Sequence, residues 1–354
     1  MSRFLNPKIA AIKSYTPGEQ PRDKRYIKLN TNESPYPPSG KVVAAISEER
    51  IMDLRLYCDP TAKLLKEAMA RAYGTEPQRV FLSNGSDDIL NFAFMAYAGE
   101  GAAYPDITYG FYSVFAALHG VAAQVIPLLP DFTVGLHRYR DRRGLVVIAN
   151  PNAPTGIYEP LSEIEELVRN NPLAVVLVDE AYIDFGGESA VSLTEKYDNL
   201  LVVGTFSKSR SMAGARLGFA IGNESLISDL EKIKYSTNPY NINSLTQAAG
   251  CATLEDGEYY RERCRMIMAA REYARGALAD LGFTVLPSEA NFIFAKSDRI
   301  GGRELYLALK ERGILVRHFD APRIADFNRI TIGTMEEMRT LVSSVEEILK
   351  ENEG

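Results

Sequence analysis

Four short apolar runs in the middle of the chain constrain its fold more than any other feature of the sequence. They are rich in Val and Leu, they do not alternate with polar residues, and helix-compatible segments separate them. Continuous apolar runs are typical of strands buried on both faces, as in a mostly parallel sheet covered by helices. The runs predict strands at residues 79–83, 145–151, 174–182 and 199–208. The sequence therefore indicates an α/β fold.

The pattern changes after Asn223, where longer helical stretches begin and the strands become short and scattered. A helical stretch is expected over residues 243–281, followed by the strands and helices of a smaller α+β unit. A chain of 354 residues exceeds one typical core, so we expect more than one domain. The expected division is an N-terminal arm (1–30) that packs on the small domain or on a partner subunit, a large domain (31–245) and a small domain (246–354).

Composition excludes several classes of protein. The chain has 46 acidic and 40 basic side chains and a net charge of −6, whereas a dedicated nucleic-acid binder needs clustered Lys and Arg. The longest apolar runs fall far short of the ~20 residues that span a bilayer, and the first residues lack the apolar core of a signal peptide. We therefore expect no nucleic-acid partner, no membrane association and a cytoplasmic location.

The scarcity of cysteine and histidine excludes several kinds of site. There are 3 cysteines, none in a CxxC pair, and 3 histidines. This predicts neither a structural metal site nor a disulfide framework, and the thiols are expected to be reduced. No GxSxG nucleophile motif occurs, and no GxGxxG fingerprint follows any predicted strand.

The segment Ser83–Asp88 opens a helix directly after the first predicted strand. Gly85 allows a tight turn there, and the free N–H groups at a helix start can hold a phosphate. Ser and Asp also cap helices without any ligand, so this segment alone leaves both interpretations open.

Two further segments place a polar side chain at a strand end. In NPNAPTG (150–156), two prolines frame Asn152, whose amide could donate to a phenolate oxygen, although the loop could equally be a simple connection. In VDEAY (178–182), Asp179 ends an apolar strand, where a buried carboxylate needs a cationic partner. A protonated ring nitrogen or a local arginine would meet that need.

Lys208 follows the last predicted strand and lies among hydroxyl and cationic side chains. Thr205 and Ser207 precede it, and Arg216 comes eight residues later. A phosphate beside a lysine that forms a Schiff base would use all three groups, whereas a solvated basic turn would need none of them. The segment is not a Walker loop, because no glycine precedes Lys208 in the required register.

Two arginines near the C-terminus, Arg317 and Arg329, flank short predicted strands. Their planar forks could bind a substrate carboxylate or phosphate through two hydrogen bonds. Each arginine taken alone could also form a surface or interface ion pair.

In chain order, these segments resemble the shared motifs of the type I pyridoxal-phosphate aminotransferases. NPNAPTG, DEAY and SKSRSMAGARLG carry the resemblance, which runs over essentially the whole chain. IKSYTPGEQ and KLNTNESPYPPS are similar to the N-terminal signature of one family among them, the histidinol-phosphate aminotransferases. LYCDP (56–60) resembles the same signature, except that Cys58 and Asp59 stand between Tyr57 and Pro60, where that family usually has a Tyr-Pro pair.

The resemblance implies the type I fold, with a mostly parallel seven-stranded sheet sandwiched by helices and a smaller α+β domain. It also implies pyridoxal 5'-phosphate as cofactor, held by Lys208 as an internal aldimine, with the freed amine then carrying out a 1,3-proton transfer. Asp179 would keep the pyridine nitrogen protonated, and Asn152 and Tyr182 would contact the phenolate oxygen. The other residues that the resemblance assigns to the cofactor are Tyr109 on the ring face and, at the phosphate, Gly85, Ser86, Asp87, Thr205, Ser207, Arg216 and Tyr57.

The implied function is transamination of L-histidinol phosphate with 2-oxoglutarate, a step of histidine biosynthesis. Arg317 and Arg329 would bind the anionic groups of these small molecules, with Tyr15 and Asn32 nearby. Tyr57 would enter the site of a second subunit, which implies a homodimer with shared active sites. An aromatic amino-acid aminotransferase and, less favoured, a threonine-phosphate decarboxylase remain alternatives, because they differ in pocket residues that the sequence does not place.

Overall fold

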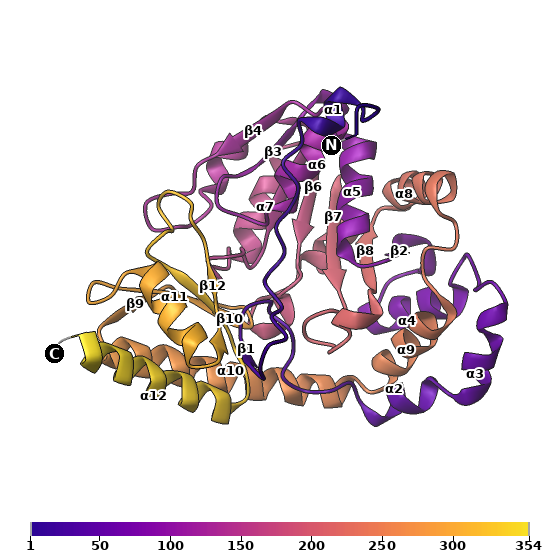
Figure 1. The fold of residues 1–354 in the computed structure, drawn as a ribbon. Coiled ribbons are helices and arrows are strands. Elements are labelled where there is room, and N and C mark those ends of the chain that lie inside the picture. The colour runs from indigo at the N-terminus through magenta and orange to yellow at the C-terminus, as the bar shows by residue number, and fades with distance from the viewer. Residues whose placement is uncertain (1, 353–354) are drawn as a thin grey trace.

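A seven-stranded sheet forms the centre of the computed structural model, which describes residues 2–352 (Figure 1). The strand order is β2-β8-β7-β6-β5-β3-β4. The strands are β2 (Val80–Ser83), β3 (Ala102–Pro105), β4 (Ala123–Ile126), β5 (Arg143–Ala149), β6 (Leu173–Asp179), β7 (Leu200–Thr205) and β8 (Gly218–Gly222). Strand β8 runs antiparallel to both of its neighbours, and the other pairings are parallel. The predicted α/β fold with a mostly parallel sheet is confirmed.

The four predicted strands correspond to β2, β5, β6 and β7, and most of their Val and Leu side chains are buried, with the exceptions of Leu173 and Val175 at the start of β6. The sequence analysis did not locate β3, β4 and β8. Three of the four residues of the edge strand β4 are exposed, and β8 begins and ends with glycine, so neither has the dense apolar pattern of a central strand.

Helices cover both faces of this sheet. The helices α5 (Ser86–Tyr97), α6 (Phe111–His119) and α8 (Glu224–Thr237) share one apolar core with it. Helix α7 (Leu161–Arg169) packs into a second core that also contains sheet residues. The helices α2 (Gly40–Ala45), α4 (Lys63–Tyr73) and α9 (Ser244–Glu255) surround a third core beside β2 and β8.

Short helical segments connect these elements. They are α1 (Pro7–Ala10), α3 (Glu48–Met52), η1 (Asp53–Arg55), η2 (Pro77–Arg79), η3 (Ala98–Glu100), η4 (Leu136–Tyr139), η5 (Ile183–Phe185), η6 (Ala190–Glu195) and η7 (Ala213–Ala215). Within residues 2–352, no helix has both the length and the apolar character needed to cross a membrane.

A second, four-stranded antiparallel sheet has the order β12-β13-β10-β9 and packs with the C-terminal helices (Figure 1). Its strands are β9 (Phe283–Val285), β10 (Phe292–Ser297), β12 (Arg317–His318) and β13 (Asn328–Thr331), and the helices are α10 (Gly257–Asp280), α11 (Gly302–Glu311) and α12 (Met335–Asn352). The single helical stretch expected over 243–281 is instead two helices, α9 and α10, because the backbone leaves the helical region at Asp256 (φ −117°, ψ 37°).

The N-terminal segment crosses the molecule from α1 to this second sheet region, as its indigo trace shows in Figure 1. Its strand β1 (Ile27–Lys28) pairs in parallel with β11 (Ile314–Leu315). Leu29, directly after β1, is buried in the core of the C-terminal elements. The predicted division into 1–30, 31–245 and 246–354 stays a prediction.

Candidate active site

A cavity of about 330 Å³ lies at the carboxyl ends of β5, β6 and β7, where the loops that follow the strands come together. Parallel strands end at one edge of a sheet, so side chains distant in sequence meet there. The predicted site residues that line the cavity are Ser86, Asp87, Tyr109, Asp179, Tyr182, Thr205, Ser207, Lys208 and Arg216. The structure therefore brings together most of the strand-end residues that the sequence analysis singled out.

Lys208 projects into this cavity from the loop after β7. Its Nζ donates to the backbone carbonyl of Thr31 at 3.3 Å and lies 5.8 Å from the centre of the Tyr182 ring. Among residues 2–352, no carboxylate lies within ion-pair distance of this amine. Burial, helped by the positive charge of Arg329, lowers the pKa of Lys208 to about 8. Roughly a tenth of the amine is therefore neutral at pH 7, far more than for an ordinary lysine, and a nucleophile or a base requires this neutral form.

Asp179 is the last residue of β6 and is 4% exposed. Its carboxylate accepts from the Tyr112 hydroxyl at 2.7 Å and from the Ala181 N–H at 3.2 Å. No cationic side chain of the described chain pairs with it. Burial raises the pKa of Asp179 to about 6, and the bond from Tyr112 opposes that rise. A cationic group brought into the cavity would give this carboxylate the partner that it lacks.

The opposite end of the cavity has the features of a phosphate site. Helix α5 begins after Gly85, which has no side chain and so leaves the first N–H groups uncapped. Gly85 adopts φ +81°, and a Cβ there would lie 2.5 Å from the Arg216 guanidinium. The glycine therefore lets Arg216 approach the helix start, where its Nη2 donates to Asp87 at 3.0 Å.

Hydroxyl groups complete this end. The Thr205 hydroxyl donates to Ser207 Oγ at 2.9 Å, and both side chains are buried. Tyr109 donates its hydroxyl to the other oxygen of Asp87 at 2.7 Å, so Asp87 joins Tyr109 to Arg216. The cavity thus has N–H, hydroxyl and guanidinium donors at one end and an isolated carboxylate at the other. This donor set fits a planar cationic ring that carries a phosphate.

A larger cavity of about 850 Å³ adjoins the first, and Tyr109, Tyr182 and Lys208 line both. The four predicted substrate residues lie on it: Tyr15, Asn32, Arg317 and Arg329. Arg329 Nη2 donates to the Asn30 carbonyl at 3.0 Å, while its Nε is buried without a hydrogen-bond partner. A buried donor of this kind is expected to gain a partner when an anion binds.

The other members of this group hold one another in place. Arg317 donates to the carbonyls of Thr16 and Pro17, which fixes the segment that carries Tyr15. Asn32 is 1% exposed, and its amide donates to the Tyr182 hydroxyl at 2.9 Å. Asn32 therefore sets the orientation of Tyr182.

Asn152 does not line either cavity, and its predicted contact with the cofactor stays a prediction. Its amide nitrogen donates to Ile107 O and Thr155 Oγ1, each at 3.0 Å, and its oxygen accepts from Thr108 at 2.9 Å. Both amide hydrogens thus have acceptors within the protein, and the side chain ties the NPNAPTG loop to the segment of Ile107 and Thr108. Ala153, the next residue, lines the cavities instead.

Tyr57 also lies outside the cavities of its own chain. Its side chain is 84% exposed, and its ring stacks on Tyr240 with centroids 4.5 Å apart. Apolar side chains of the surrounding segment are exposed as well: Val43, Ile51, Met52, Leu54, Leu56 and Leu64. A patch of this kind is typical of a protein–protein interface.

Sequence reasoning missed three residues of the site. Tyr112 lies on α6, three residues after Tyr109, and donates its hydroxyl to Asp179. The signal in the sequence was a tyrosine in a mostly apolar helix. Thr31 and Glu33 line the cavity beside Lys208. Both lie in KLNTNESPYPPS, where the resemblance suggested only Asn32 as a contact.

Comparison with known proteins places this site in a family. The family described as aminotransferase class I and II matches residues 24–345. The chain is 50% identical over 353 residues to histidinol-phosphate aminotransferase of Brachyspira hyodysenteriae, covering 99% of this chain and 100% of the relative. It is 49% identical to histidinol-phosphate aminotransferase 2 of Dechloromonas aromatica, covering 98% and 99%.

A solved structure has the same fold. Histidinol-phosphate aminotransferase from Sinorhizobium meliloti in complex with pyridoxal-5'-phosphate superposes with a TM-score of 0.85. The two chains are 23% identical, and 99% of each is covered. The arrangement of the sheet and of the C-terminal elements is therefore shared over the full length.

Proposed function

This chain belongs to the class I and II aminotransferases, and we propose that it transfers the amino group of L-histidinol phosphate to 2-oxoglutarate. The cofactor is pyridoxal 5'-phosphate, and the reaction is a step of histidine biosynthesis. We place the enzyme in the cytoplasm, with support from its three free thiols, Cys58, Cys251 and Cys264, which suit a reducing compartment.

One observation carries the proposal: a single cavity joins the amine of Lys208 to the isolated carboxylate of Asp179 and opens toward the guanidinium of Arg329. Among the described residues, Lys208 has no carboxylate within ion-pair distance, Asp179 has no cationic partner, and Arg329 Nε has no hydrogen-bond acceptor. The cofactor and the substrates would supply these partners. Relatives of about half-identical sequence bear the name histidinol-phosphate aminotransferase over their full length, which supports this choice of amino donor.

The cofactor residues follow from the cavity. Lys208 would hold the cofactor, and the uncapped start of α5 with Arg216 and the hydroxyls of Thr205 and Ser207 would hold its phosphate. When bound, pyridoxal 5'-phosphate supplies an electron sink that stabilises negative charge on the substrate carbon that carries the amino group. Asp179 would hold the proton on the ring nitrogen, because its carboxylate has no other cation to pair with.

Lys208 also moves the proton of the reaction. Its pKa of about 8 leaves enough neutral amine to take up the proton that leaves the substrate carbon. The same Nζ then donates that proton on the cofactor side. Tyr182, fixed by Asn32, closes the cavity beside the amine.

Arg329 and Arg317 would bind the anionic end of each substrate. Histidinol phosphate carries a phosphate and no carboxylate, whereas 2-oxoglutarate carries two carboxylates. A guanidinium fork accepts either group, so one arginine pair can serve both substrates in turn. Tyr15 lines the larger cavity together with this pair, and its ring stacks on Phe111 with centroids 4.3 Å apart.

We further propose a homodimer with shared active sites. Tyr57 does not line a cavity of its own chain, it is 84% exposed, and exposed apolar side chains surround it. A second copy packed on this patch would bury these side chains and bring each Tyr57 to the phosphate end of the partner's cavity.

A half-reaction screen tests the proposed function. Purified protein loaded with cofactor is mixed separately with histidinol phosphate, phenylalanine, tyrosine, glutamate and threonine phosphate, and the visible absorbance and products are followed. Histidinol phosphate and glutamate should convert the cofactor fastest. Faster conversion by the aromatic amino acids, or release of carbon dioxide from threonine phosphate, would contradict the proposal in favour of one of the two alternatives.

A further inference from the structure

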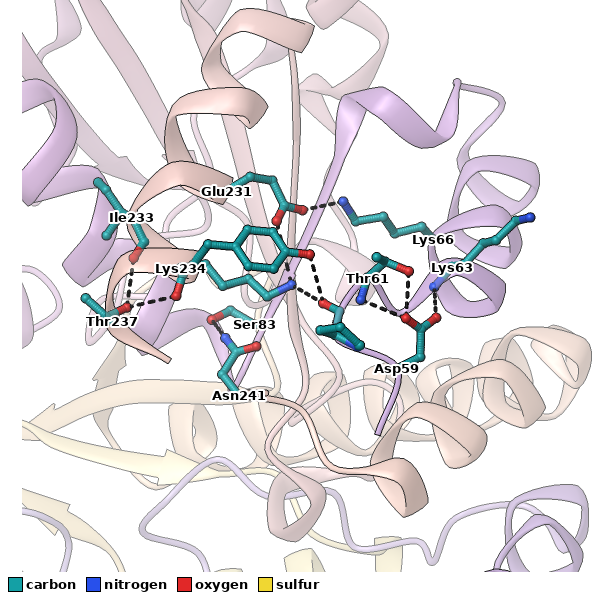
Figure 2. Close-up of polar contacts among 12 residues, drawn as sticks. Asp59, Thr61, Lys63, Lys66, Ser83, Glu231, Ile233, Lys234, Thr237 and Asn241 are labelled. Atoms are coloured by element: carbon teal, nitrogen blue, oxygen red, sulfur yellow. Dashed lines mark hydrogen bonds and ion pairs between the residues drawn. The ribbon is translucent and has the colours of Figure 1, made fainter. Parts of the chain in front are cut away.

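A lysine that lines neither cavity is buried between a carboxylate of its own helix and a backbone carbonyl. Lys234, near the end of α8, is 2% exposed, and its nearest acidic atom, Glu231 Oε2, is 3.6 Å away (Figure 2). The other oxygen of that carboxylate accepts from Lys66 on α4. Burying an ammonium is unfavourable unless close polar groups satisfy it. With the carboxylate of Glu231 at 3.6 Å, the Lys234 ammonium therefore needs a second, closer partner.

That partner is a backbone carbonyl. Lys234 Nζ donates to Pro60 O at 2.7 Å, which is the shortest polar contact of this ammonium. Pro60 lies three residues after Tyr57, in a segment without helix or strand between η1 and α4. A charge-assisted bond to a carbonyl is stronger than a neutral one, so it fixes the backbone of a segment that has no secondary structure of its own.

Weaker contacts hold the rest of this segment. Gln247 on α9 donates to the Asp59 carbonyl at 2.9 Å, and the Asp59 carboxylate accepts from the N–H groups of Thr61 and Lys63. Figure 2 shows Asp59 turned toward Thr61 and Lys63, and Lys234 extending from α8 beside Glu231. The segment is thus attached to α8, α9 and α4 at successive residues.

The Tyr57 side chain itself has little to hold it. Its hydroxyl makes no hydrogen bond within residues 2–352, and the stack on Tyr240 is its one aromatic contact there. The direction in which the Tyr57 side chain points therefore depends on the backbone of residues 57–60, which the bond from Lys234 to the Pro60 carbonyl holds in place.

We infer that Lys234 is a positioning residue that holds the Pro60 carbonyl so that Tyr57 is presented to the partner's cofactor phosphate. This inference rests on the proposed function, in which Tyr57 crosses to the second subunit. Without the ammonium, the carbonyl loses its charged partner, and its attachment to α8 is reduced to the longer bond from the Tyr235 hydroxyl, at 3.4 Å. Tyr57 then reaches the phosphate less often. The defect appears in the other subunit's site, not in that of the altered subunit.

The first experiment measures cofactor affinity. Lys234→Met keeps the unbranched stem of the side chain and removes the donor, and the remaining Glu231 stays paired with Lys66. The dissociation constant of pyridoxal 5'-phosphate, from titration of the cofactor-free dimer, should rise by about tenfold. The matched control, Lys66→Met, removes the other ammonium on Glu231 and leaves the Pro60 bond intact, so the constant should stay within about twofold.

Hybrid dimers separate positioning from general damage. In the first hybrid, one subunit carries Lys234→Met and the other carries Lys208→Ala. The site that keeps Lys208 then receives Tyr57 from the subunit with native Lys234, and its cofactor affinity should equal that of wild type. In the second hybrid, both substitutions are in one subunit, and the native subunit's site should show the full loss. Loss in the first hybrid and not in the second would overturn the inference.

Tyr57→Phe in the same hybrids distinguishes a failure of the positioning role of Lys234 from a failure of the shared active site. If Tyr57→Phe acts across the dimer and Lys234→Met does not, the positioning role is wrong while the shared site stands. If Tyr57→Phe itself has no effect on the partner's site, the shared-site proposal fails. Should Lys234→Met not fold, Lys234→Gln, one bond shorter and uncharged, decides in its place, with a smaller loss expected in the same direction.

Discussion

The two cavities that meet at Lys208 are built in different ways. The smaller one is formed by the ends of neighbouring strands of one sheet and by the loops that follow them directly. The larger one is formed mostly by segments from distant parts of the chain, around residues 11–18, 30–32, 106–117 and 317–329, with Ala153, Pro154, Tyr182 and Lys208 where it meets the smaller one. The smaller cavity therefore depends mainly on one sheet, with Thr31 and Glu33 added from the N-terminal segment, whereas the larger depends on how the arm and the C-terminal elements pack against that sheet.

This difference separates the reaction from the choice of substrate. Lys208 and Asp179 lie on a rigid, buried framework, which suits groups that need fixed positions and shifted pKa values. Arg317, Arg329 and Tyr15 lie where separate elements meet, which suits a wall that must accept two substrates of different shape. Substitutions in the first cavity should therefore affect turnover, and those in the second should affect substrate binding.

Lys208→Ala should have the largest effect, because it removes both the attachment point of the cofactor and the proton carrier. We expect turnover to fall by about 10⁴-fold or more, while the donors at the phosphate end still bind cofactor. Steady-state assays together with a cofactor titration check this. Transamination retained by Lys208→Ala would refute the assignment of the lysine.

Asp179→Asn should lower kcat by about 10³-fold, since the amide cannot hold a proton on the ring nitrogen by charge. The same substitution should stabilise the cofactor-free protein at pH 8. Asp179 has a higher pKa folded, about 6, than its ordinary 3.8, so the folded chain binds the proton more readily, and ionisation destabilises it as pH rises. Urea unfolding should show a gain of up to about 3 kcal/mol at pH 8 that disappears below about pH 4.

Arg329→Ala acts in the second cavity and should raise the KM of both the amino donor and the oxo acid, by about 10²-fold, with a smaller change in kcat. The control is Arg312→Ala, whose guanidinium pairs with Glu351 outside both cavities. An effect on only one of the two substrates would show that they do not share this anion site.

Asn152→Ala should have the smallest effect on the reaction. Because the amide bonds to Ile107, Thr108 and Thr155, its loss should lower the free energy of unfolding by about 1–3 kcal/mol and leave cofactor affinity within about threefold. Thermal unfolding and cofactor titration measure the two effects. A large loss of cofactor affinity without loss of stability would restore the role that the sequence suggested.

The strands and site residues that the sequence predicts are those whose position is marked by the residues directly around them. Central strands such as β6 and β7 show in the sequence because a strand buried on both faces must be continuously apolar, and Asp179 and Lys208 show because they interrupt that pattern at a strand end. The edge strand β4 could not be found in this way, because solvent permits polar residues on it.

Residues that act through other residues were harder to foresee. Nothing in an apolar helix marks Tyr112 as the partner of Asp179, since their contact joins positions 67 residues apart. Asn152 is the opposite case: its motif is visible in the sequence, but whether its amide faces a ligand or the segment of Ile107 and Thr108 depends on backbone geometry that the sequence pattern does not specify.

The pairing of β1 with β11 has a consequence for synthesis on the ribosome. The arm leaves the ribosome first, but the residues that complete its side of the larger cavity come last; Arg329 and its acceptor Asn30 are 299 positions apart. At about 10 residues per second, roughly half a minute separates their emergence. The nascent chain therefore carries an unattached arm during that interval, and the wall that Arg329 contributes to the larger cavity is absent until Arg329 has emerged.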